Sequence, residues 1–290
     1  MKRLKRLLKR RSSGGFTLVE MVVSVALLAI LLGGMMLFIS PIVRSFNDNK
    51  TDLTAENVAT AVQEYITRNL RNANQVAVFS YVNESTLATG NYQALIDQMV
   101  KFCKDVNKDG SNPLPAGKEK YLLKCISLRY DSSSGKYYLC NEKVNSLNGA
   151  LESVALDSKK VFSDCLYKDL FLTVDIKKTL NDDFGSTDTQ IYNRTEEYRS
   201  DALDITICAF KDSARQVKVF EGSGISELRA IKGMLTQDTK NSATYFMKMI
   251  PDNPDPADGS TLKFEDSADG SRDIFIYYVV RRLSPVAATP

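Results

Sequence analysis

The chain has 290 residues, and its 38 lysines and arginines against 35 aspartates and glutamates give a formal net charge of +3. It has no histidine, which excludes Ser-His-Asp and Cys-His catalysis and every metal site that uses imidazole. Seven of the positive charges lie in the first fifteen residues, so the remainder has more acidic than basic side chains. This balance argues against a nucleic-acid-binding domain.

A basic leader, residues 1–15, ends in Gly14 and Gly15 and precedes an apolar run of membrane length. The run covers residues 16–39, and its single charged residue is Glu20. About 20 residues suffice to span a bilayer as a helix, and the positive leader favours a cytoplasmic N-terminus. We therefore expect one membrane-spanning helix here, with the rest of the chain outside the cytoplasm.

The position of Glu20 bears on two alternative interpretations of this stretch. A carboxylate at the bilayer centre costs roughly 2.5–3.5 kcal/mol, so its presence suggests a use. A secretory signal peptide also begins with basic residues, but Glu20 interrupts the start of its apolar region and no clear small-residue cleavage site follows. A plain signal anchor would carry Glu20 incidentally.

The string G-F-T-L-V-E at residues 15–20 resembles the class III signal of type IV prepilins and type II secretion pseudopilins. The resemblance is close over residues 8–45 and extends loosely to about residue 73, where the sequence is similar to larger minor pilins and J-type pseudopilins. It implies that prepilin peptidase cuts after Gly15 and N-methylates Phe16. It also implies that the membrane-stored subunit joins other pilin or pseudopilin subunits at an assembly platform.

Phe16 and Glu20 are the residues that we expect to set the register of assembly. The new amine of Phe16 would lie four residues before Glu20, too close in one helix for an ideal pair. A neighbouring copy shifted along the axis could bring its own amine to this carboxylate. Unlike charges attract strongly in a dry environment, although desolvation offsets much of the gain. Glu20→Ala should therefore insert into the membrane but enter filaments poorly.

The sequence after the apolar run predicts an amphipathic continuation of the helix. Apolar residues recur mostly three, four or seven positions apart, with polar residues between them. The stripe comprises Phe46, Leu53, Val58, Val62, Tyr65, Ile66, Leu70 and Ala73. Pro41 and a Gly-Gly pair at 33–34 predict either a kink or a segment that melts or stretches during assembly.

The remaining sequence predicts one extracytoplasmic α+β domain, with the N-terminal helix packed on a mainly antiparallel sheet. The expected parts are a leader at 1–15, an assembly helix at 16–40, its amphipathic half at 41–75 and a globular domain at 76–290. Strands are predicted at 76–82, 121–130, 136–140, 170–178, 203–210, 214–222, 242–250 and 272–283. Short helices are predicted at 92–104, 150–162 and 225–235, and long surface loops at 179–200 and 251–271.

One segment resembles the opening of a calcium loop. Asp105, Asn107 and Asp109 precede a glycine in the pattern D-x-N-x-D-G. The closing glutamate should fall at Ala116, but Glu119 comes three residues late. The two interpretations are a calcium site built from these oxygens and an ordinary Asp-Gly turn.

All five cysteines follow the apolar run and form no C-x-x-C pair. Outside the cytoplasm up to two disulfides could form, leaving one odd thiol, or the side chains could be small buried apolar groups. The pairing cannot be deduced. The candidates are Cys103, Cys125, Cys140, Cys165 and Cys208.

The combined features predict a minor type IV pilin or pseudopilin-like subunit, because the mature chain is long for a main subunit of that family. It would reside in the cytoplasmic membrane and then in a pilus, secretion pseudopilus or uptake filament. The alternative is a filament-borne or membrane-anchored surface binding protein, such as an adhesin or DNA-uptake component. We expect no enzymatic activity, no cofactor apart from the calcium considered above, and no nucleic-acid partner.

Overall fold

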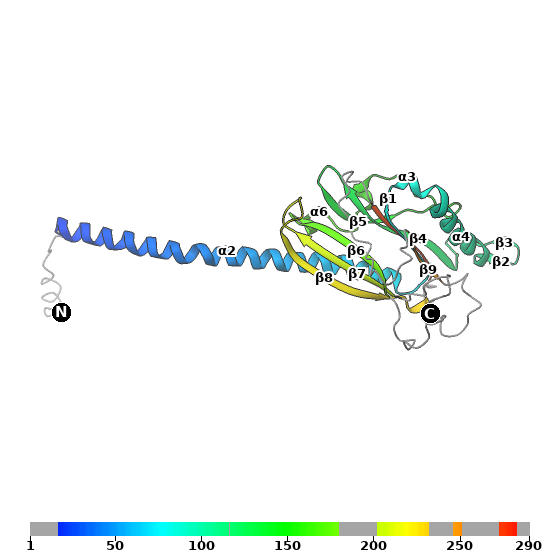
Figure 1. Cartoon of the computed structure of the whole chain (residues 1–290), viewed down its shortest axis with the longest axis horizontal. Helices are drawn as coiled ribbons and strands as arrows, with labels where there is room; N and C mark the ends of the chain where they lie inside the picture. The colour runs from blue at the N-terminus through cyan, green and yellow to red at the C-terminus, as the bar shows by residue number, and fades with distance from the viewer. Residues whose placement is uncertain (1–16, 116, 180–201, 232–245, 251–272, 283–290) are drawn as a thin grey trace, which may run out of the picture. The chain divides into compact units, whose positions relative to one another are not determined.

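The computed structural model describes residues 17–115, 117–179, 202–231, 246–250 and 273–282. The chain divides into two units, Met1–Asp52 and Leu53–Pro290. Helix α2 extends from Leu18 to Leu70 and contributes to both units. The second unit contains the strands and the other described helices (Figure 1).

A five-stranded sheet in the order β5-β4-β10-β1-β9 is central to the second unit. Only the β1–β9 pairing is parallel among the described strands of this sheet, and the other three pairings are antiparallel. The strands are β1 Ala73–Val82, β4 Tyr121–Asp131, β5 Lys136–Glu142, β9 Phe246–Ile250 and β10 Asp273–Arg281. Residues 274–279 of β10 are all buried. A strand covered on both faces carries a continuous apolar run rather than an alternating one.

Helix α4, Gly90–Val106, packs on one face of this sheet. Its buried residues have the three- to four-residue spacing of a helix with one apolar face. They are Leu95, Ile96, Met99, Val100 and Cys103. In the same cluster lie Phe79 of β1 and Phe275 and Tyr277 of β10. Helix α3, Glu84–Leu87, adds Leu87 to this cluster.

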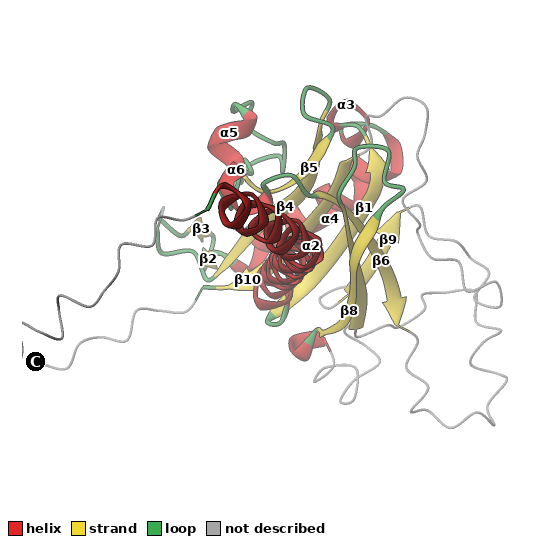
Figure 2. Ribbon diagram, turned by 90° about the vertical axis from the view of Figure 1, so that its left-hand side faces the viewer, coloured by secondary structure: helices red, strands yellow, loops and turns green. Residues whose placement is uncertain are grey.

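The C-terminal part of α2, residues 55–70, and a three-stranded sheet pack on the other face of the five-stranded sheet. Alternate residues of a strand point to opposite faces, and Val76, Val78 and Ile276 belong to this second cluster. The sheet has the order β6-β7-β8, all antiparallel, with bounds β6 Phe171–Thr179, β7 Ala202–Phe210 and β8 Lys218–Glu227. The residues of α2 that enter the cluster are Ala55, Val58, Ala59, Val62, Ile66 and Leu70. Figure 2 looks along α2 and shows the strands of both sheets beside it.

A glycine permits the close approach of β8 to α2. A Cβ atom added to Gly224 would lie 1.5 Å from Nε2 of Gln63. A larger residue at this position would require the end of the Gln63 side chain to move. The absence of a side chain at Gly224 therefore leaves room for the amide of Gln63 beside β8.

The predicted fold class is confirmed: a long N-terminal helix precedes a mostly antiparallel α+β domain. The helix predicted over 150–162 is wrong for most of its length, because only α5, Leu156–Lys159, is helical there. A further short helix, α6, Asp164–Tyr167, was not predicted. The short helix predicted at 92–104 corresponds to α4.

Two predicted boundaries around β8 are also wrong. The strand does not begin at residue 214, because Asp212 accepts hydrogen bonds from the N–H groups of Gln216 and Val217 and holds a turn there. The helix does not begin at residue 225, because Ile225 pairs with Asp204 and the strand continues to Glu227. Pairing with β7 overrides the local helical preference at this point. The loops predicted at 179–200 and 251–271 lie almost entirely outside the described residues.

Candidate processing and assembly site

Helix α2 begins with a reciprocal pair of hydrogen bonds between Thr17 and Glu20. The backbone N–H of Glu20 donates to Oγ1 of Thr17 at 3.2 Å. In return, Oε2 of Glu20 accepts from the backbone N–H and from the hydroxyl of Thr17, each at 3.4 Å. This arrangement is a capping box, which satisfies backbone donors that a helix start leaves unpaired. Glu20 therefore helps to cap the N-terminus of its own helix.

The role of Thr17 was not predicted, although the sequence contained its signal. A threonine followed three positions later by a glutamate, ahead of an apolar run, is the pattern of a capping box. All the hydrogen bonds of the Glu20 carboxylate among the described residues involve Oε2. Its second oxygen, Oε1, has no hydrogen-bond partner among the residues that the structure describes.

The first part of α2 presents apolar side chains along its length. The large apolar residues from Leu18 to Ile39 are each at least half exposed in the isolated chain. The helix is long and apolar enough to cross a membrane, with an 18-residue window of mean hydropathy 2.7. Removing such side chains from water stabilises by roughly 1.5–3 kcal/mol for each one fully buried. This surface therefore favours a membrane or neighbouring helices around it.

The helix is continuous through Gly33, Gly34 and Pro41. Nothing lies within 4 Å of a Cβ atom built on either glycine. The helix is therefore unbroken at these residues in the isolated chain. A kink at the membrane exit and melting during assembly stay predictions. The residues predicted for processing, Gly14, Gly15 and Phe16, lie outside the described residues.

The predicted calcium-loop residues lie at the end of α4 and in a small hairpin, β2 Lys108–Asp109 and β3 Asn112–Pro113. Oδ1 of Asn107 accepts hydrogen bonds from the N–H groups of Lys120 and Tyr121, at 2.7 and 2.9 Å. Asp105 forms an ion pair with Lys108 at 3.0 Å. Gly110, which follows Asp109, has the positive φ of a tight turn.

This geometry gives Asp105 and Asn107 other partners. Within the part of the chain that the structure describes, no group of three or more acidic, cysteine or histidine residues could hold a metal ion. That statement concerns carboxylates, thiols and imidazoles, and it does not cover asparagine oxygens such as that of Asn107. Calcium binding at Asp105, Asn107 and Asp109 accordingly stays a prediction.

All five cysteines are free thiols. Burial raises the pKa of Cys103 and of Cys140 to about 12, and burial likewise raises the pKa of Cys125. Cys208 is half-buried and Cys165 is exposed. Cys125 and Cys140 belong to different hydrophobic clusters although their strands are neighbours. Three of the five thus act as buried apolar side chains, as one of the two interpretations held.

Comparison with known proteins identifies the N-terminal segment. Residues 10–36 match the family model of the prokaryotic N-terminal methylation motif. Together with the long apolar helix, this match fits a type IV prepilin-like class III signal. No curated protein matches the chain, and no solved structure does. The protein thus has a prepilin-like signal joined to an α+β domain.

Proposed function

We propose that the protein is a minor type IV pilin or pseudopilin-like subunit. Prepilin peptidase cleaves it between Gly15 and Phe16 and methylates the new amine. The mature chain is stored in the cytoplasmic membrane as a single-pass protein and is then added to a filament, or starts one. The protein acts through assembly and not as an enzyme, and it requires no cofactor for this role.

The observation that carries this proposal is the position of Glu20 in the methylation motif at the start of an exposed apolar helix. The capping box with Thr17 uses one carboxylate oxygen, and the other has no partner among the described residues and could accept from an incoming donor. The amine of Phe16 in a neighbouring subunit is such a donor. Pairing there requires the two helices to be offset along their axes, which sets a stagger between subunits.

The apolar surface of α2 provides the main favourable term of assembly. The same side chains face lipid before assembly and the helices of other subunits afterwards. Lipid is as apolar as these side chains, so transfer alone gives little discrimination. The Glu20 pair therefore contributes specificity of register, while close helix packing contributes the stability of the filament.

The test is the N-terminus and intact mass of the protein from native membranes, with and without prepilin peptidase. A chain that starts at a methylated Phe16 only when the peptidase is present supports the proposal. A chain that still starts at Met1 would indicate a plain signal anchor. Cleavage beyond residue 39 would indicate a secreted protein, and either of these two results would refute the proposal.

A further inference from the structure

Strand β10 lies in the middle of the five-stranded sheet although it follows every other described strand in the sequence. On one side it pairs with β1, for example Phe275 with Phe79. On the other side it pairs with β4, for example Ile274 with Leu128. Without β10, the strands β1 and β4 would each have an unpaired edge toward this position.

Both pairings join distant parts of the chain, whereas the other antiparallel pairings are more local. Ser127 of β4 pairs with Cys140 of β5, and Ile207 of β7 pairs with Gly222 of β8. The entropic cost of closing a loop grows with its length, and contacts between distant residues form slowly. The two hairpins can therefore form before the sheet is complete.

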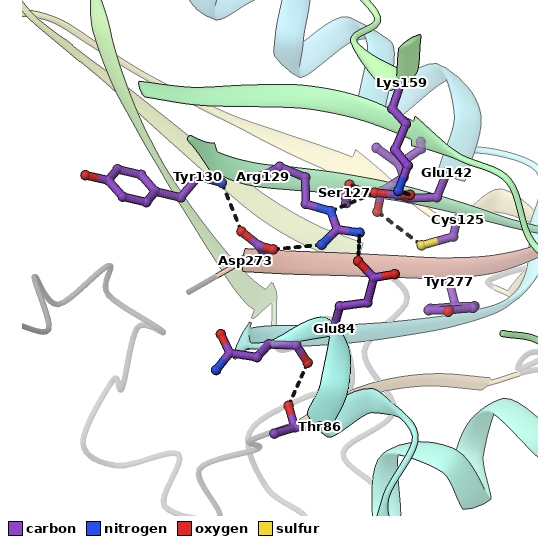
Figure 3. A network of polar contacts seen from close by, with 12 residues as sticks. Glu84, Thr86, Cys125, Ser127, Arg129, Tyr130, Glu142, Lys159, Asp273 and Tyr277 are labelled. Carbon is purple, nitrogen blue, oxygen red and sulfur yellow. Dashed lines mark hydrogen bonds and ion pairs between the residues drawn. The ribbon is translucent and has the colours of Figure 1, made fainter. Parts of the chain in front are cut away.

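The start of β10 is held by a buried ion cluster (Figure 3). Oδ2 of Asp273 accepts from Nη1 of Arg129 at 2.9 Å, and Oδ1 accepts from the N–H of Tyr130 at 2.9 Å. The guanidinium of Arg129 also lies 4.5 Å from the ring centre of Phe275. The first and third residues of β10 thus both contact one arginine of β4.

The other partners of Arg129 come from segments that precede β10. Its Nε donates to Glu142 of β5 at 2.8 Å, and its Nη2 donates to Glu84 of α3 at 2.7 Å. Glu142, whose side chain is fully buried, also accepts from Ser127 at 2.6 Å and forms an ion pair with Lys159 at 2.8 Å. Burial opposes the ionisation of Glu142, but the hydrogen bonds hold its pKa below the usual value.

We propose that insertion of residues 273–281 between β1 and β4 is the closing step of folding, and that Arg129 is the preset anchor that receives the strand. Arg129 keeps Glu84 and Glu142 as partners before insertion, so its charge is already compensated. The arrival of β10 adds a third carboxylate and an aromatic ring. The same step buries residues 274–279 on both faces.

This order has a consequence for export, which rests on the proposed function. A chain that crosses the membrane from its N-terminal helix outward delivers residue 273 after all the other described strands. Until then the sheet has a gap at its centre, so the domain cannot reach its final stability. The fold therefore delays closure until the sequence through β10 has been exported.

The test is pulsed hydrogen exchange during refolding of the full chain in detergent micelles. We expect the amides of β10 to gain protection in the last phase, after those of the β4–β5 and β7–β8 hairpins. Asp273→Ala should lengthen that phase without changing the protection of the hairpins. Asp157→Ala, which alters an ion pair whose carboxylate is 87% exposed, is the control and should leave every phase unchanged.

A second measurement uses chains that end at residue 272 or at residue 282, expressed with the complete N-terminal helix. The shorter chain should be digested rapidly by external protease, and the longer chain should resist. Protection of β10 as early as the hairpins, or resistance of the chain that ends at 272, would overturn the proposal. Neither result depends on whether the protein enters a filament, so the proposed function can fail independently.

Discussion

Glu20→Gln should separate the capping role that the structure shows for this carboxylate from the register role that we propose for it. Glutamine can take the place of glutamate in a capping box, so the start of α2 should persist. The charge that would attract the amine of a neighbouring subunit is lost. Thr17→Ala is the converse change. It keeps the charge of Glu20 but removes the hydroxyl that accepts a hydrogen bond from the backbone N–H of Glu20 at 3.2 Å.

The expected magnitudes of the two changes differ clearly. Loss of a threonine N-cap costs about 1 kcal/mol, or roughly fivefold in an equilibrium constant. Removal of one partner from a buried ion pair typically costs about 3–5 kcal/mol, or roughly two to four powers of ten. Filament incorporation should therefore fall slightly in Thr17→Ala and almost completely in Glu20→Gln. Glu20→Ala should resemble Glu20→Gln.

The assay is the fraction of the protein in sheared filaments, compared with the amount in membranes of the same cells. Membrane level and the mass of the mature N-terminus serve as controls, because a variant that is not inserted or processed cannot report on assembly. Incorporation of Glu20→Gln at the wild-type level would refute the pairing argument. Defects in Thr17→Ala and Glu20→Ala together with normal incorporation of Glu20→Gln would assign the role of Glu20 to capping alone, because glutamine keeps the capping box.

Three further predictions concern the domain. Ile66→Ala should lower the free energy of unfolding by about 2–5 kcal/mol in chemical denaturation, because Ile66 is fully buried. The control is Glu64→Ala at an exposed position, and an equally small loss in both variants would contradict the docking of α2. Gly149→Ala should lower the melting temperature more than Gly110→Ala. Both glycines have positive φ, but only a Cβ atom at Gly149 would lie 2.3 Å from the side chain of Ile96. Equal losses of melting temperature would contradict this packing. A thiol reagent should label the exposed Cys165 quickly and the buried Cys103, Cys125 and Cys140 only after unfolding. Labelling of these three thiols in the folded protein would contradict their burial.

The sequence indicated the N-terminal motif because its signals are local. The leader charge, the glycine, the single carboxylate and the apolar length all occur within about forty consecutive residues of the sequence. The capping box was also readable there, since Thr17 and Glu20 are three positions apart. The helical stripe from Val58 to Leu70 predicted the face that is buried, because a period near 3.6 residues identifies a helix face without any tertiary contact.

The elements that the sequence mispredicted are those decided by partners elsewhere in the chain. Ile225 has helix-compatible neighbours but belongs to β8, because its backbone pairs with Asp204. Most of residues 150–162 is irregular because the segment packs at the edge of the sheet, where Lys160 forms an isolated bridge with Cys140. Local propensity is a weak term, and a set of ladder hydrogen bonds and buried contacts outweighs it.

The sequence by itself therefore determined the fold class, the N-terminal methylation motif and the periodicity of the main elements. The tertiary structure decided the central place of β10 and the ion cluster around Arg129, whose members come from α3, β4, β5, α5 and β10. The physical reason is the range of the interactions. Capping and amphipathic periodicity act within a few residues of one helix, whereas sheet order and buried ion pairs depend on which distant segments the folded chain brings together.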